Sequence, residues 1–218
     1  MSERVSQEVK AFKPYSMIMV IFPAYSDSEL IETIINSPKP LIAAVNGPAI
    51  GIISFSDTCS CEGIGVTSLG LNDLVYSVPH ATFHTPFMRW GLAAEGCSSA
   101  TFPAILGHQK AAALLIAGEV ITAEELHVAG LITRVLPADR FLEKVLEVAE
   151  RMAGYSQNAI KTTRDLLRRK WRNELHEANL RECQALRERA ANNDAMPNVL
   201  AFIEETKRKK EGKTKAKL

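Results

Sequence analysis

Glu95 is the residue in this sequence with the clearest capacity for acid/base chemistry. It lies in GLAAEGCSS (91–99), where Gly96-Cys97-Ser98-Ser99 is compatible with a helix start just after the carboxylate. A carboxylate at a helix start can accept hydrogen bonds from the free amides of the first turn. Held close to a substrate, it can instead take up and release protons. The residues by themselves leave both roles open.

The segments that must position Glu95 alternate between short strands and helices. Apolar residues at helical spacing predict a helix over 29–36, and LIAAV (41–45) predicts a buried strand ended by the turn signal Asn46-Gly47-Pro48. Further strands are expected at 74–77, 81–83 and 131–135, and further helices at 109–117, 122–130 with a Thr122–Glu125 capping box, 141–153 and 159–191. In the last helix, Leu167, Trp171, Leu175 and Ala178 are expected near one face. This alternation predicts an α/β layered fold with a helical C-terminal region from about residue 138.

The bulk composition is that of an ordinary soluble domain. The chain has 218 residues, of which 46% are hydrophobic and 23% are charged. The apolar run Met17 to Phe22 is too short for a membrane span and lacks the layout of a secretory signal. Four cysteines without zinc or thioredoxin spacing predict free thiols and no metal site.

Basic residues are concentrated at the C-terminal end. Residues 207–218 carry seven Lys or Arg and one Glu, a charge of +6, so the remaining residues carry about −5 of the net +1. Such a run is commonly a solvated, flexible end, and we expect no nucleic-acid partner. The last residues, Ala216-Lys217-Leu218, are a variant of the S-K-L peroxisomal address. They predict binding to the import receptor and a peroxisomal location, with the cytoplasm as the alternative.

Four ordered segments resemble the crotonase superfamily of enoyl-CoA hydratases and isomerases. They are PLIAAVNGPAIG (40–51), GVTSLGLNDLVYS (65–77), ATFHTPFMRWGLAAEGCSSATFPAILG (81–107) and KAAALLIAGEVITAEELHVAGLITRVLP (110–137). The resemblance implies a crotonase-like β/α spiral core over 29–204, a homo-oligomer (trimer or hexamer), an acyl-coenzyme A thioester as substrate and no cofactor. It also implies a glycine turn, here Gly47, Gly51 and Gly65, in which a backbone amide faces the thioester oxygen.

Within this family, the resemblance separates the hydratases from the isomerases. Hydratases of this family use two glutamates. The position that matches the first glutamate is Thr67, whose hydroxyl is not a base near neutral pH. The position that matches the second glutamate is Glu95. One base with an oxyanion hole suits isomerisation of 3-enoyl-CoA to trans-2-enoyl-CoA, and FHTPF followed by EGCSS resembles the peroxisomal Δ3,Δ2-enoyl-CoA isomerase branch. Catalysis by Glu95 is then implied.

Other side chains near Glu95 have ordinary interpretations beside functional ones. In such an isomerase Phe83, His84 and Phe87 could line the acyl tunnel, although aromatic residues so placed are commonly core and a histidine beside a strand is commonly structural. Cys97 precedes the possible helix start, a setting that can lower a thiol pKa, but packing is the simpler role.

Two features depart from the family. Residues 1–28 are irregular and show no match to the family's first strand and turn, so the core is expected to be incomplete at the N-terminus. IISFSDTCSCEGI separates Gly51 from Gly65, and removing twelve residues, Ile52 to Gly63 or Ile53 to Ile64, restores the family-like turn. The Ile52 and Ile64 amides are therefore the oxyanion candidates. An inactive acyl-CoA-binding or subunit-interaction protein is the alternative function, and a hydratase is the third.

Overall fold

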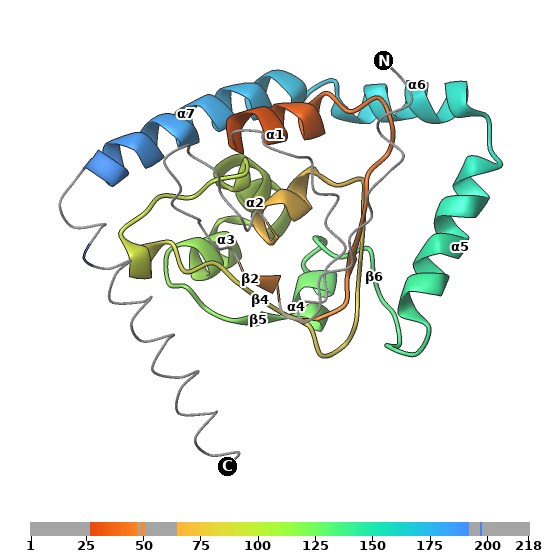
Figure 1. Ribbon diagram of the computed structural model, residues 1–218, viewed down its shortest axis with the longest axis horizontal. Coiled ribbons are helices and arrows are strands. Elements are labelled where there is room, and N and C mark those ends of the chain that lie inside the picture. Colours follow the sequence, from red (N-terminus) through yellow and green to blue (C-terminus); the bar gives the residue numbers. More distant parts are fainter. Residues whose placement is uncertain (1–26, 48, 51–64, 192–196, 198–218) are drawn as a thin grey trace, which may run out of the picture.

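Helices and strands alternate in the first half of the domain, and three helices complete it. The computed structural model describes residues 27–47, 49–50, 65–191 and 197 (Figure 1). In chain order the elements are α1 (Asp27–Ile35), β1 (Ile42–Val45), β2 (Ala49–Ile50), the 3₁₀ turn η1 (Thr67–Leu71), β3 (Leu74–Ser77), β4 (Thr82–His84), η2 (Met88–Trp90), α2 (Ser98–Leu106), α3 (His108–Leu115), β5 (Ile121–Thr122), α4 (Ala123–Val128), β6 (Arg134–Val135), α5 (Phe141–Ala153), α6 (Gln157–Arg168) and α7 (Arg172–Ala191). Within these ranges no helix is both long and apolar enough to cross a bilayer.

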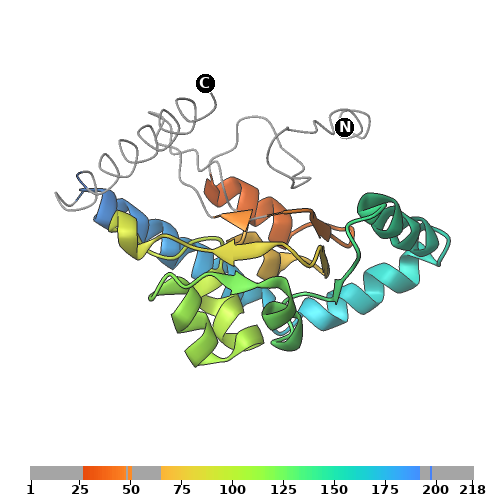
Figure 2. The same cartoon turned by 90° about the horizontal axis from the view of Figure 1, so that it is seen from below.

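The strands form two small sheets. In the first, β3 lies between β1 and β6 and is parallel to both, and in the second, β4 pairs parallel with β2 and antiparallel with β5. The central strands are largely buried, as expected for strands covered on both faces. Figure 2 shows the strands between α1 on one side and the α2–α3 pair on the other. The fold is therefore a layered α/β structure with a helical C-terminal part, as the sequence predicts.

Two apolar clusters hold the layers together. The larger one surrounds the strands and includes Phe83, Phe87 and Phe102, and it also contains Tyr76 of β3 with Phe141 and Val145 of α5. The smaller one joins four elements through Ile31, Ile35, Leu71, Cys97, Leu175 and Ala178. It fixes α1 against α7, which lie side by side along one edge of the molecule (Figure 1). The start of α2 is packed into this smaller cluster.

Several predicted elements are confirmed within a residue or two. The helix over 141–153, the strand over 74–77 and the Thr122–Glu125 capping box are present as expected. One expectation for a strand is wrong, and two strands were not predicted. The predicted strand over 131–135 shrinks to Arg134–Val135, and the two-residue strands β2 and β5 are additional. The amides of Leu131 and Ile132 both donate to the Leu126 carbonyl, so these residues close α4 instead of joining a sheet.

The prediction of one continuous helix over 159–191 is wrong. The chain turns at residues 169–171, which separate α6 from α7. Leu175 and Ala178 are buried as expected, whereas Leu167 is 74% exposed and Trp171 is 39% exposed. The break rotates the inward face, and the inward side chains of α6 are arginines instead of leucines.

Those arginines converge on Asp73, at the junction of η1 and β3. Arg164 and Arg168 donate from Nε to the Asp73 carboxylate at 2.9 and 3.2 Å, and the Leu41 amide donates to it at 2.8 Å. Arg164 also donates to the Ser37 carbonyl, and Arg168 to the Leu71 carbonyl. One half-buried carboxylate therefore connects α6 with the start of β1 and with β3.

We expect Asp73→Ala to lower the free energy of unfolding by about 3 kcal/mol, because it leaves the buried Arg164 guanidinium without its counter-charge. Glu143→Ala is the matched control, since the Arg140–Glu143 pair is exposed on both sides and its removal should change stability by less than about 1 kcal/mol. Urea unfolding measures both variants. Equal losses would show that the Asp73 cluster adds nothing beyond a surface ion pair.

Candidate active site

Glu95 lies in the connection between η2 and α2 and is 3% exposed. Two consecutive residues after it adopt left-handed backbone conformations, Gly96 with φ 68° and Cys97 with φ 60°. This conformation is ordinary for glycine and costs a residue with a Cβ about 1 to 2 kcal/mol. The turn allows the chain to leave Glu95 and enter α2 at Ser98 within two residues.

The first-turn amides of α2 have acceptors other than the Glu95 carboxylate. Cys97 and Ser99 donate from their amides to the two carboxylate oxygens of Glu182 on α7, at 2.7 and 2.8 Å. Ser98 donates from both its amide and its hydroxyl to the backbone carbonyl of Glu95. The amides of Cys97 and Ser99 therefore do not hold the Glu95 carboxylate, because Glu182 is their acceptor.

Glu182 was not identified from the sequence. It lies 85 residues from Cys97 on a charge-rich helix, where it resembles the solvent-facing glutamates around it. It is only 5% exposed, and burial raises the pKa of its carboxyl group. A buried charge on an otherwise polar helix is a signal that only the packing of α7 on α2 reveals.

Thr67 lies directly against the turn that follows Glu95. It is fully buried, and a Cβ placed on Gly96 would come within 2.7 Å of its hydroxyl oxygen. Among the residues that the structure describes, this oxygen has no hydrogen-bond partner. The two positions that the family resemblance assigns to carboxylates thus converge, with a carboxylate at Glu95 and a hydroxyl beside the next residue.

Cys97 is a packing residue. Its thiol is fully buried and donates to the Leu175 carbonyl at 3.3 Å. Burial raises the pKa of the Cys97 thiol far above its usual range, and the nearby Glu182 carboxylate raises it further. The thiolate that nucleophilic chemistry requires is therefore disfavoured at this position.

The three candidates for the acyl tunnel occupy β4 and the segment after it. Phe83 and Phe87 are fully buried in the larger cluster, which is the packing role weighed for them. His84 is half-buried, and its pKa is lowered by burial and by the positive charge of Arg89, which favours a neutral ring. Contact of these side chains with an acyl chain stays a prediction.

Part of the predicted site lies outside the described residues. This applies to the amides of Ile52 and Ile64, to Gly51 and to the terminal Ala216-Lys217-Leu218. Gly47 and Gly65, which flank that part of the glycine turn, are described and buried. The oxyanion hole therefore stays a prediction.

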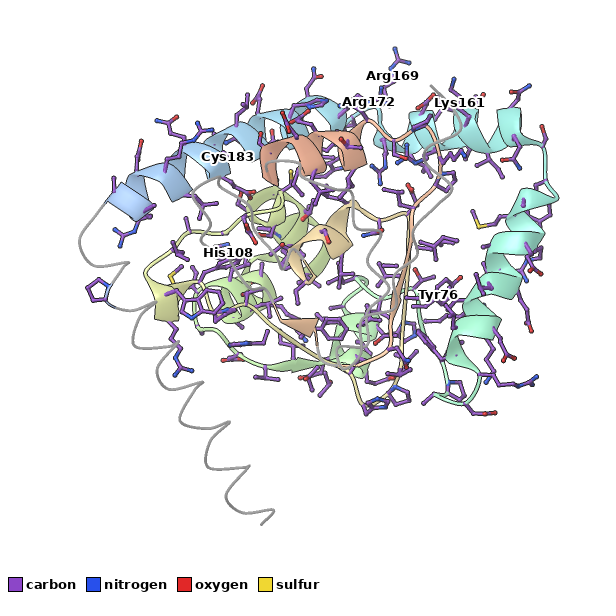
Figure 3. All side chains as sticks on the ribbon, in the orientation of Figure 1. Tyr76, His108, Lys161, Arg169, Arg172 and Cys183 are labelled. Carbon is purple, nitrogen blue, oxygen red and sulfur yellow. The ribbon has the colours of Figure 1, made fainter. Side chains whose placement is uncertain are left out.

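A separate hollow lies along the C-terminal helices. A cavity of about 430 Å³ is bordered by Thr162, Asp165, Leu166, Arg169, Arg172 and Asn173. Lys161, Arg169 and Arg172 lie along the outer side of this region in Figure 3. Asp165 neutralises part of the charge by pairing with Arg172 at 3.2 Å. These residues belong to α6, α7 and the turn between them, so the hollow is distinct from the Glu95 turn.

Comparison with known proteins gives consistent matches. The enoyl-CoA hydratase/isomerase family matches residues 22–213. Enoyl-CoA delta isomerase 2 of Rattus norvegicus is 38% identical over 80% of this chain and 42% of its own length, and enoyl-CoA delta isomerase 3, peroxisomal, of Mus musculus is 37% identical over 74% and 47%. The crystal structure of an enoyl-CoA hydratase/isomerase from Pseudoalteromonas atlantica superposes with a TM-score of 0.72 at 32% identity, over 80% of this chain and 66% of that one. The chain thus spans less than half the length of these two curated relatives.

We expect Gly96→Ala to destabilise the protein by about 2 to 4 kcal/mol, because the new methyl group adds a collision with Thr67 to the cost of the left-handed backbone. Gly118→Ala is the control. Gly118 has nearly the same φ, 64°, but its nearest atom would be 3.8 Å away, so about 1 to 2 kcal/mol is expected. Thermal and urea unfolding compare the two, and equal losses would contradict close packing of Thr67 on the turn.

Proposed function

The chain belongs to the enoyl-CoA hydratase/isomerase family, and from this premise we propose that it converts 3-enoyl-CoA to trans-2-enoyl-CoA in fatty acid β-oxidation. The observation that carries the proposal is that Glu95 is buried and that Thr67 packs on Gly96, the residue after it. The two positions that carry carboxylates in a hydratase thus hold one carboxylate and one hydroxyl. The isomerase names of the rat and mouse relatives support the same activity.

In the proposed reaction, Glu95 moves one proton between two carbons. Its carboxylate removes a proton from C2, and the electron pair of the broken C–H bond delocalises through the thioester to give a dienolate. Backbone amides of the glycine turn stabilise the negative charge on the thioester oxygen. The protonated Glu95 then delivers the proton to C4, and the double bond moves from C3–C4 to C2–C3. No net proton is gained or lost.

Burial of Glu95 suits this role. A carboxylate that is 3% exposed is shielded from bulk water, so the proton it takes up is not readily lost before it reaches C4. Hydration would require a second base to activate water, and the Thr67 hydroxyl is not ionised near neutral pH. Isomerisation is therefore favoured over hydration at this site.

Subunit contacts are a second part of the proposal. Apolar side chains are exposed on the C-terminal helices, namely Leu142, Leu146, Leu166 and Leu167. Exposed leucines so close in sequence support association of α5 and α6 with further copies of the chain, as a trimer or hexamer. An acyl-CoA-binding or subunit-interaction protein without turnover is the second candidate function, and the interruption between Gly51 and Gly65 favours it. Turnover of 3-hexenoyl-CoA distinguishes the two.

Glu95→Gln should lower the rate of 3-hexenoyl-CoA isomerisation by about 10² to 10⁴-fold, because the amide keeps the shape of the side chain and removes the base. Glu124→Gln, on the exposed first turn of α4, serves as the control and should keep the wild-type rate. Thermal unfolding verifies that both variants are folded. A Glu95→Gln protein with more than about a tenth of the wild-type rate would refute the assignment of the base.

The terminal tripeptide yields a prediction about location. Deleting Ala216-Lys217-Leu218 should move a fluorescent fusion from peroxisomes to the cytosol, because the import receptor reads a free C-terminal address. The fluorophore is placed at the N-terminal end so that the C-terminus stays free. Microscopy beside a peroxisomal marker provides the measurement. An intact fusion that is already cytosolic would rule out a peroxisomal location.

A further inference from the structure

The turn between Glu95 and α2 is held from outside by Glu182. Its carboxylate accepts the amide of Cys97 at 2.7 Å and that of Ser99 at 2.8 Å, one oxygen for each. Both oxygens act as acceptors, which is the arrangement of a carboxylate that caps a helix, although the cap residue comes from another helix. The Glu182 side chain and Cys97 are buried, so water does not compete for the Cys97 amide.

The turn needs such a restraint. Cys97 is a residue with a Cβ in a left-handed conformation, which persists only where the surroundings hold it. Glu182 binds the amide of this residue, and the Leu175 carbonyl accepts from its thiol at 3.3 Å. On the other side, Thr67 packs on Gly96. The restraints thus act on the two residues that immediately follow Glu95.

We propose that Glu182 is a positioning residue for Glu95, since it occupies the first-turn amides of α2 and holds the Gly96-Cys97 turn. This inference rests on the proposed role of Glu95 as the base. Without Glu182, the amides of Cys97 and Ser99 lack an acceptor, and the nearest carboxylate along the chain is Glu95 itself. Glu95 would then be drawn toward α2 as a helix cap and away from the substrate.

Loss of the Glu182 cap would also change the pH at which Glu95 titrates. A carboxylate that accepts hydrogen bonds from backbone amides is stabilised in its charged form, so it releases its proton at lower pH. Loss of the Glu182 cap should therefore shift the titration of Glu95 to lower pH and weaken it as a base. Other titratable groups near the cap are Arg181, Cys183 and the Glu32–His176 pair, in which His176 Nδ1 lies 2.6 Å from Glu32 Oε2 between α7 and α1. They are the same in every variant, and both substitutions of Glu182 remove its negative charge, so the difference between Glu182→Ala and Glu182→Gln isolates the effect of the lost hydrogen-bond acceptor.

The experiment compares Glu182→Ala and Glu182→Gln with wild type in the full chain. Glu174→Gln is the control, because Glu174 belongs to the same helix and pairs with Arg181 on an exposed face. The first readout is the carbon-13 NMR titration of the Glu95 carboxyl group, identified by its absence in Glu95→Gln. The second is kcat and KM for 3-hexenoyl-CoA, measured at a temperature at which every variant is folded.

For Glu182→Ala we expect titration of Glu95 at lower pH and a kcat about 10 to 100-fold below wild type, with a smaller change in KM. Glu182→Gln keeps one acceptor and should fall between the two. An unchanged Glu95 titration together with a kcat within about twofold of the Glu174→Gln control would overturn the proposal.

Two further outcomes are also decisive. If Glu182→Ala does not fold, the Glu95 titration and the kinetic constants are measured on Glu182→Gln, and the same results support or overturn the proposal. If wild type fails to turn over 3-hexenoyl-CoA, the proposed function fails, while the NMR titration still decides whether Glu182 controls Glu95. A purely structural role for Glu182 would lower the unfolding temperature and shift the titration of Glu95 equally in Glu182→Ala and Glu182→Gln, because both substitutions remove the same negative charge.

Discussion

The capping of α2 by the Glu182 carboxylate is the interaction on which the candidate site depends. It joins the C-terminal helix α7 to the turn after Glu95 through a buried hydrogen bond of 2.7 Å and a partly buried one of 2.8 Å. The helix start needs an acceptor, because its first amides have no partner within the helix. Since α7 supplies that acceptor, the amides of Cys97 and Ser99 do not bind the carboxylate of Glu95, which lies two residues before the N-cap. The long polar helix therefore binds the turn beside Glu95 across 85 residues of chain.

The helices that complete the domain act through buried charges as much as through apolar contacts. Asp73 receives two arginines of α6 and one strand amide, and Glu182 receives two amides of α2. Between these two polar contacts lies the small apolar cluster of α1, η1 and α7. A buried charge is tolerated only where its hydrogen bonds are satisfied, so each contact admits few alternative arrangements. The position of α7, and with it Glu182, is thereby specified.

The residue types at positions 95 and 67 bear on which reaction of the family this chain could catalyse. Members of a fold family share an architecture, whereas the groups at the site decide the reaction. Here a buried carboxylate precedes a glycine whose missing side chain makes room for the threonine. The Thr67 side chain is thus part of the packed turn that follows Glu95.

Much of this was contained in the sequence itself. Local patterns determined the helix over 141–153, the strand over 74–77 and the Thr122–Glu125 cap, because their signals lie within a few residues of one another. The resemblance of ordered segments pointed to Glu95 and Thr67. The break between α6 and α7 and the capping by Glu182 were decided by tertiary structure alone. An exposed glutamate and a buried one have the same side chain, and only the packing of α7 against α2, across 85 residues of chain, determines that Glu182 is the one desolvated and bound to backbone amides.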